Sequence, residues 1–327
     1  MEKVKLSEIG EFGLIDKLTR EIKSGEVVIG IGDDAAVLRD GTGFRLYTTD
    51  MMVEGDHFRL GWADPVQIGR KAMDSNISDI AAMGGFPDFA LVSMALTENV
   101  EVETVEGIYR GMYEVADRYG VEIIGGDTTH GNNMVLNLVV MGRTDDENLC
   151  TRSGAKAGDL VLVTGPLGGS KAGLELLLRG YKEPAAPVRK HLDPGCRMDI
   201  SRSISPFASA MIDVSDGLAS EVGHICRRSG VGAVVERALI PLHEGCVEAA
   251  EKVEGDPYAF ALSGGEDFEL VFTVPRKDLD RVRGYGVVVG RITHKKEGMW
   301  LKGPDRRTPL GGGFDHFSQV KGKEKDV

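Results

Sequence analysis

The sequence predicts a mixed α/β protein that is built from two domains, and three observations predict this class. The chain has 327 residues, which is enough for two domains of ordinary size. Over the first half, apolar runs typical of strands alternate roughly with amphipathic stretches typical of helices. Residues 143–159 are polar and lack periodicity, so we place the domain boundary in this segment, with domains at 1–148 and 149–327.

The first elements expected are a helix and a hairpin. Residues 7–22 carry apolar side chains at helical spacing. The strand-like runs VVIGIG and FRLYTT flank the turn Asp40-Gly41-Thr42-Gly43, and Asp-Gly adopts positive φ at little cost. If the two runs pair, Asp33 or Asp34 leaves the sheet close to Asp50, and carboxylates at such range repel unless one protonates or a cation lies between them.

The next helix is expected to begin at Asp64-Pro65, a good N-cap followed by a good first-turn residue, and to end at Gly84-Gly85. It carries Asn76 and Asp79 three residues apart, on a face other than its apolar stripe. The rest of this half should be a buried strand, PDFALVSMAL, a helix over residues 102–119 that stops at Gly120, and two strands in VEIIGGDTTHG and MVLNLVVMG.

The second half should contain further strands and helices. The glycine-rich turn GPLGGSK begins a helix whose N-terminal amides are placed to face an anion. Residues 181–197 are expected to be partly helical and receive no role. The strands are expected in LVLVTG, MIDVS, GAVVER, FELVFTVP and GVVVGRI, and the other helices near Leu218, over residues 242–253 and in KDLDRVRG.

Composition and charge exclude several classes of function. The formal net charge of −12 argues against a nucleic-acid partner, because binding a phosphate backbone needs a basic surface. The four cysteines are far apart and form no Cys-x-x-Cys pair. No run approaches the ~18 apolar residues that a membrane helix needs, and the N-terminus has no signal-peptide core. We therefore expect a cytoplasmic protein that acts on neither nucleic acid nor membranes.

Acidic residues recur where strands are expected to end, with glycines beside them. One such Gly-Asp motif is an ordinary turn, but the repetition favours a multi-metal, phosphate-handling site over coincidence. Adjacent side chains of an extended chain point to opposite faces, so only one of Asp33 and Asp34 should be a ligand, and we favour Asp33. The motifs contain Asp33, Asp50, Asp127, Asp213, Asp216, Glu266 and Asp267.

The chemistry of such a site is phosphoryl transfer on an unusual scaffold. A nucleoside triphosphate and a phosphorylated acceptor meet only if Mg²⁺ ions, held by carboxylates, bridge their oxygens. GPLGGSK lacks the Walker A spacing, since Ser170 intervenes before Lys171. The Gly-rich, His-Arg-Asp and Asp-Phe-Gly motifs of protein kinases are also missing.

Taken together, the motifs resemble the thiamine-monophosphate kinase family, of the same superfamily as aminoimidazole ribonucleotide synthetase, selenophosphate synthetase and the hydrogenase maturation protein E. The resemblance covers nearly the whole chain. GIGDD, SGGEDFEL and GFDHF point to the thiamine member rather than to its relatives. The motifs, in the family's order, are GEFGLI, GIGDDAAVL, TTDMMVEGDHF, NISDIAAMGG, GGDTTHG, TRSGAKAGD, IDVSDGL, LSGGEDFEL and GGGFDHF.

The resemblance implies a fold and a set of site residues. The N-terminal domain, with a mixed sheet, would bind Mg-ATP and pair with a second copy around a shared β-barrel, and the C-terminal α/β domain would complete the nucleotide and substrate sites. Asp74 departs from the family, which more often has an apolar residue there. The implied magnesium ligands are Asp33, Thr48, Thr49, Asp50, Asp79, Asp127, Asp213 and Asp216; the ATP contacts are Gly126, Asp127, Arg152 and Ser215; and the substrate contacts are His57, Glu266 or Asp267, and Phe314.

The implied reaction is transfer of a phosphoryl group from ATP to thiamine monophosphate, giving thiamine diphosphate. The acceptor phosphate is already mostly a dianion at neutral pH, since its second pKa is ~6, so no residue is needed as general base. The alternative within the superfamily is an ATP-dependent synthetase that activates an amide-type oxygen. A protein that only senses nucleotide or metal is the more distant alternative.

Overall fold

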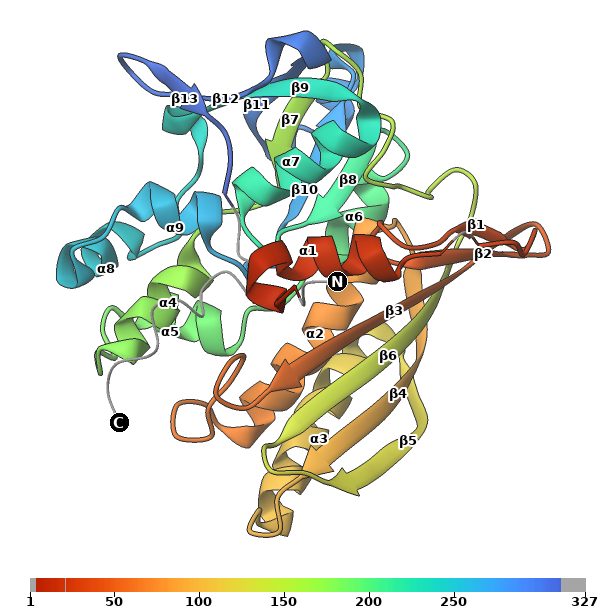
Figure 1. Cartoon of the computed structure of the whole chain (residues 1–327), viewed down its shortest axis with the longest axis vertical. Coiled ribbons are helices and arrows are strands. Elements are labelled where there is room, and N and C mark those ends of the chain that lie inside the picture. The colour runs from red at the N-terminus through yellow and green to blue at the C-terminus, as the bar shows by residue number, and fades with distance from the viewer. Residues whose placement is uncertain (1–3, 21, 313–327) are drawn as a thin grey trace.

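The computed structural model describes residues 4–20 and 22–312, and these form two mixed sheets with helices packed around them (Figure 1). The first sheet has the order β1-β2-β3-β6-β4-β5, and every neighbouring pair is antiparallel except β4 and β5. Its strands are β1 (Val27–Ile29), β2 (Ala36–Asp40), β3 (Gly43–Val53), β4 (Phe86–Leu96), β5 (Glu122–His130) and β6 (Val135–Thr144).

Helices α2 (Pro65–Ala82) and α3 (Val102–Tyr119) cover one face of this sheet. The N-cap Asp64 accepts a hydrogen bond from the Val66 amide, the Gln67 side-chain oxygen accepts one from the Asp64 amide, and Pro65 occupies the first turn. Gly120 ends α3 in the left-handed conformation. Both helices were predicted, because local signals mark the start of α2 and the end of α3.

The hairpin differs from the prediction. β2 and β3 form it around Asp40 and Gly43, as the turn predicts, but VVIGIG is not its other arm. Its strand β1 instead pairs with β2, on the outer side of the hairpin. The first helix, α1 (Leu6–Leu18), ends earlier than expected and is kinked at Gly10, which has a φ of 67°.

The second sheet has the order β13-β12-β9-β11-β7-β10-β8, with β9 and β12 parallel and the other pairs antiparallel. Its strands are β7 (Leu160–Val163), β8 (Ala210–Asp213), β9 (Val231–Glu236), β10 (Leu270–Val274), β11 (Val287–His294), β12 (Met299–Lys302) and β13 (Arg307–Pro309). The helices of this half are α4 (Gly169–Leu178), α5 (Ala185–Leu192), α6 (Met198–Ile204), α7 (Leu218–Ser229), α8 (Cys246–Val253), α9 (Pro257–Ser263) and α10 (Leu279–Val282).

Two details of this half correct the prediction. Residues 257–263, where no helix was predicted, form α9, whose N-cap Asp256 accepts a hydrogen bond from the Tyr258 amide. The helix expected over residues 242–253 is shorter and begins only at Cys246.

Helix α2 lies between the two halves and is buried nearly all round. One side packs on β3, β6 and α3, and the other contacts α5, α6 and β8 of the second half. Because of this second contact, the polar residues of α2 are buried as deeply as its apolar stripe. This arrangement brings α2 next to the end of β8.

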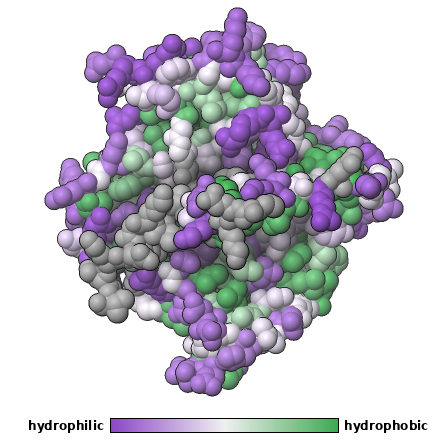
Figure 2. Space-filling model, viewed as in Figure 1, coloured by the Kyte–Doolittle hydropathy of each residue, from purple (hydrophilic) through white to green (hydrophobic). Residues whose placement is uncertain are grey.

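Neither sheet closes into a barrel within the described ranges, so the first sheet keeps the open edges β1 and β5. Its outer face carries exposed apolar side chains at Tyr47, Met51, Phe86 and Phe89. In Figure 2 apolar residues gather at the lower right, over the region where Figure 1 draws β3, β6 and β4. The helices that the structure describes include none with the length and apolar character needed to span a membrane.

Candidate active site

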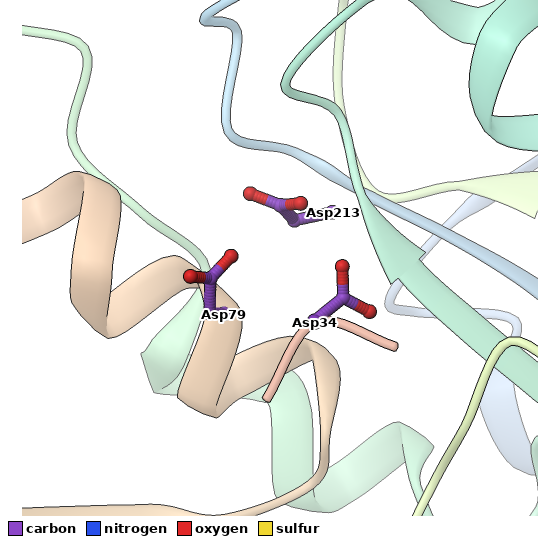
Figure 3. Close-up of side chains that lie close together, drawn as sticks. All are labelled: Asp34, Asp79 and Asp213. Carbon is purple, nitrogen blue, oxygen red and sulfur yellow. The ribbon is translucent and has the colours of Figure 1, made fainter. Parts of the chain in front are cut away.

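Three carboxylates from distant parts of the chain meet at the junction of the two halves (Figure 3). Asp34 follows the β1 strand, Asp79 lies on α2, and Asp213 is the last residue of β8. Each offers one oxygen, and the three oxygens lie within 4.8 Å of one another. Such a group of oxygen ligands suits a hard divalent cation.

Hydroxyl and guanidinium groups orient the three carboxylates. Thr48 on β3 donates to Asp79, and Ser78 donates from its Oγ to Oδ2 of Asp213 at 2.7 Å. The Arg152 guanidinium donates to Oδ1 of Asp34 at 2.6 Å. The carboxylates are therefore held in place by neighbours rather than by one another.

The electrostatics of the cluster call for a further positive charge. Burial first, and then the neighbouring carboxylates, raise the pKa of Asp79 and of Asp213 well above the usual value. Burial also raises the pKa of Asp34, although Arg152 opposes it. Oδ2 of Asp34 is buried and has no hydrogen-bond partner among the described residues. A cation that shares the three carboxylates would satisfy this oxygen and offset their repulsion.

Asp33 and Asp34 take different positions, so only one of them lies in the carboxylate cluster. The Asp33 carboxylate accepts the backbone N–H of Arg152 at 3.0 Å and lies outside the group of three, whereas Asp34 lies inside it. Burial, and then the charge of Asp34, raise the pKa of Asp33 to about 6. The geometry thus favours Asp34 as the ligand, where the sequence interpretation favoured Asp33.

Asp50 and Thr49 lie within β3 rather than at its end, because the strand continues to Val53. The Asp50 amide donates to Oδ1 of Asn76 at 3.0 Å. Burial, and then the charges of Glu266 and Asp34, raise the pKa of Asp50 to about 6. The Thr49 hydroxyl is on the outer face of the sheet and donates to Asn137 at 3.2 Å.

Gly126 and Asp127 also lie inside a strand, the exposed edge strand β5, and not after it. A Cβ on Gly126 would lie 1.7 Å from the Val92 carbonyl oxygen, so close pairing of β4 and β5 alone requires this glycine. Asp127 is exposed and is not one of the carboxylates that the structure groups together.

Ser215 and Asp216 form the turn between β8 and α7. The Ser215 carbonyl accepts the Glu266 amide at 2.9 Å, which joins this turn to the SGGEDF loop. The Asp216 amide donates to the buried Glu221 carboxylate at 2.9 Å. Burial, and then the charges of Asp216 and Asp213, raise the pKa of Glu221 well above its usual value.

A second polar group lies beside the carboxylates. Glu266 accepts a hydrogen bond from the Lys71 ammonium at 2.9 Å, and Lys71 also donates one to the His57 carbonyl oxygen at 3.0 Å. His57 accepts the Val53 amide at Nδ1. Phe314 lies outside the described residues.

Asp267, next to Glu266, is turned away from this group. Its two oxygens accept the amides of Gly168 and Ser170 at 2.5 and 3.0 Å, at the start of α4. The anion expected at this helix N-terminus is therefore a carboxylate of the chain itself.

Sequence reasoning missed several polar residues of the site. Lys71, Ser75 and Ser78 are fully buried on the face of α2 that carries Asp79. From Lys71 through Ser75 and Ser78 to Asp79 the steps are four, three and one residues, which trace one helix face. This spacing is the signal that could have found them. His191 and Glu221 carry no comparable signal.

The chain is similar to known proteins over most of its length. Residues 32–144 match the N-terminal domain of the AIR synthase related protein family, and residues 156–301 match its C-terminal domain. The thiamine-monophosphate kinase of Aquifex aeolicus is 38% identical over 84% of this chain and 89% of that protein. That of Escherichia coli K12 is 36% identical over 94% of this chain and 98% of that protein. A solved structure of AaThiL complexed with AMPPCP and TMP has a TM-score of 0.85 and 35% identity, and covers 96% of this chain and 99% of that one.

Proposed function

Since the chain belongs to the thiamine-monophosphate kinase family, we propose that the carboxylate cluster at the junction of its two halves is where its reaction takes place. The chain is an enzyme that phosphorylates thiamine monophosphate with ATP. The observation that supports this location is the group of Asp34, Asp79 and Asp213, with a buried carboxylate oxygen that has no partner in the described part of the chain.

The donor set fits Mg²⁺, because it consists of oxygens only and carries more negative charge than its neighbours balance. When bound, magnesium supplies positive charge that screens the repulsion between two phosphorylated substrates. We keep Asp33 as a neighbour that orients Arg152 and assign the ligand oxygen to Asp34. The ligands proposed are Asp34, Asp79 and Asp213, with Thr48, Thr49, Asp50, Asp127 and Asp216 as further ones implied by the family.

The residues of the chain act by binding and positioning. Arg152 already donates to Asp34, and its Nε is buried without a hydrogen-bond partner among the described residues, so the guanidinium can take a phosphate oxygen. The acceptor phosphate attacks as a dianion, so transfer is direct and in line, and no side chain removes a proton. Gly126, Asp127 and Ser215 complete the proposed ATP contacts.

His57 and Glu266 are the proposed contacts of thiamine monophosphate, and Phe314 is the proposed aromatic wall. Glu266 is the better candidate of the pair at 266–267, because the Asp267 carboxylate is already bound to the start of α4. A carboxylate at position 266 suits a substrate whose ring end is positively charged.

Product analysis with ATP, Mg²⁺ and thiamine monophosphate tests the reaction. We expect thiamine diphosphate and ADP in equal amounts. Release of free phosphate without thiamine diphosphate would instead indicate the amide-activating synthetase, and binding without turnover would indicate a sensor. Because no residue acts as base, His57→Ala should slow single-turnover transfer less than Asp213→Ala does, and equal losses would contradict the direct mechanism.

We also propose that the domains divide at residue 148 and that the protein is cytoplasmic.

We further propose that the chain forms a homodimer. The support for the homodimer is the outer face of the first sheet, where Tyr47, Met51 and Phe89 alternate with the buried residues of the same strands. A second copy of this face would complete the barrel that one chain leaves open. Light scattering should give a dimer for the natural chain and a monomer for Met51→Lys, whereas a monomeric natural chain would refute the proposal.

A further inference from the structure

The Lys71 ammonium joins the two halves of the chain at the proposed substrate pocket. Its side chain is only 3% exposed. It donates to the Glu266 carboxylate from the second half and to the His57 carbonyl oxygen from the first half. Both partners are proposed substrate contacts, and one buried lysine therefore holds them together.

Glu266 is held at one oxygen and open at the other. Its contacts to Lys71 and to His191 are both made by Oε2, at 2.9 and 3.6 Å. Oε1 has no hydrogen bond or ion pair with the described residues, and the side chain is 26% exposed, against 3% for Lys71. The backbone at Glu266 has a φ of 64°, so this loop is fixed in a conformation that a non-glycine residue rarely adopts. A fixed carboxylate with a free oxygen is an acceptor for a positively charged ligand.

His191 supports Glu266 from the other side without adding charge. It lies on α5, is 5% exposed, and its Nδ1 is 3.1 Å from the Ser170 hydroxyl. Burial, and then the Lys71 ammonium, lower the pKa of His191 to about 3, so it is neutral at physiological pH. Lys71 is thus the one lysine or arginine that pairs with Glu266 in the described ranges. The segment 181–197, to which the sequence assigned no role, delivers this histidine.

The cavity beside Lys71 is too small to admit a substrate ring. The cavity is lined by His57, Trp62 and His191, among others, and has a volume of about 10 Å³. This is room for one water molecule and not for a ring. Lys71 must therefore act through the residues it holds.

We propose that Lys71 is a positioning residue that fixes Glu266 as the acceptor for the positively charged ring end of the substrate. This rests on the proposed function, since that places thiamine monophosphate against Glu266. The consequence is a role in binding and not in transfer, because the phosphate reacts at the carboxylate cluster. Removing Lys71 should therefore raise KM for thiamine monophosphate and leave kcat nearly unchanged.

Steady-state kinetics of Lys71→Met tests this. Loss of one partner of a buried charge pair should raise KM for thiamine monophosphate by about tenfold or more, with KM for ATP and kcat changed by less than about twofold. Unphosphorylated thiamine carries the ring end without the phosphate, so its inhibition constant should rise by the same factor as KM. An unchanged inhibition constant would place the effect at the phosphate and overturn the proposal. The matched control is Lys190→Met, a lysine 13% exposed whose nearest carboxylate is Glu269, and KM should stay unchanged there.

The double variant Lys71→Met/Glu266→Gln removes both charges and keeps the proposal testable if Lys71→Met does not fold. KM of the double variant should lie within about threefold of that of Glu266→Gln alone, because Lys71 acts through Glu266. A further tenfold loss in the double variant would show independent action and refute the inference. If the natural chain makes no thiamine diphosphate, the proposed function itself is wrong. If the natural chain makes thiamine diphosphate and Lys71→Met has the same KM for thiamine monophosphate, only this inference is wrong.

Discussion

Replacement of Asp74 by Asn should stabilise the protein, and most of the gain should depend on pH. Asp74 lies in the middle of α2 and is 1% exposed, and its Oδ1 has no hydrogen-bond partner among the described residues. Burial raises the pKa of Asp74 from 3.8 to about 6, against the opposing effects of the Cys196 thiol and the Arg118 guanidinium. The folded state therefore holds a proton that the unfolded chain has released.

The sign and size of the effect follow from this shift. Below pH 4 Asp74 is protonated in both states and costs nothing. Between pH 4 and pH 6 the unfolded chain ionises first, so the free energy of unfolding decreases as the pH rises. The full loss, reached above pH 6, is about 3 kcal/mol, because one pKa unit corresponds to about 1.4 kcal/mol. Asn cannot ionise and avoids this loss.

Thermal unfolding measures the difference. An unfolding entropy of about 2 cal/mol/K per residue converts 3 kcal/mol into a Tm increase of about 5 °C for Asp74→Asn at pH 8. At pH 5 the increase should be about half as large. Asp117→Asn, which removes the same charge from the exposed face of α3, should change Tm by the same small amount at both pH values. A gain for Asp74→Asn that does not vary with pH would refute the assigned ionisation.

Three further outcomes follow from the geometry. Mg²⁺ should raise Tm of the natural chain, because it binds only the folded cluster, and thermal scans of Asp34→Asn should show a smaller rise or none. Gly126→Ala should lower Tm by several degrees, because its Cβ would meet the Val92 carbonyl oxygen. Gly41→Ala has open space around its Cβ, so Tm should fall only by the strain of placing alanine at a positive φ. Asp64→Ala should lower the free energy of unfolding by about 1 kcal/mol in urea titrations, since it removes the cap of α2; an unchanged midpoint would contradict the cap's contribution.

The sequence predicts best where the signal is local. The start of α2 follows from Asp64 and Pro65, and the end of α3 follows from Gly120, because these capping preferences need no partner from elsewhere in the chain. Pairing of β1 with β2 was not predicted, because the choice between two apolar runs depends on the whole sheet. For the same reason Asp50 and Asp127 were expected after strands that in fact continue past them.

The candidate site was predicted in its residue types and only partly in its geometry. Asp79 and Asp213 come together as the acidic motifs indicate. The structure groups Asp34 rather than Asp33 with Asp79 and Asp213, and no sequence period encodes which of the two adjacent side chains does so. Lys71 was missed because a lysine on an amphipathic helix is usually solvated, and only the second half of the chain buries it.

The double burial of α2 restricts how this helix can vary in length. Lys71 binds Glu266 of the second half and Asp79 lies in the carboxylate cluster, while Ile68 and Ile80 pack in the core around the first sheet. One residue inserted between positions 71 and 79 would rotate everything after it by about 100° and shift it by about 1.5 Å. Asp79 would leave the cluster while Lys71 stayed at Glu266, so no single adjustment could restore both contacts. Insertions and deletions in homologous chains should therefore fall outside this helix, even where its individual residues differ.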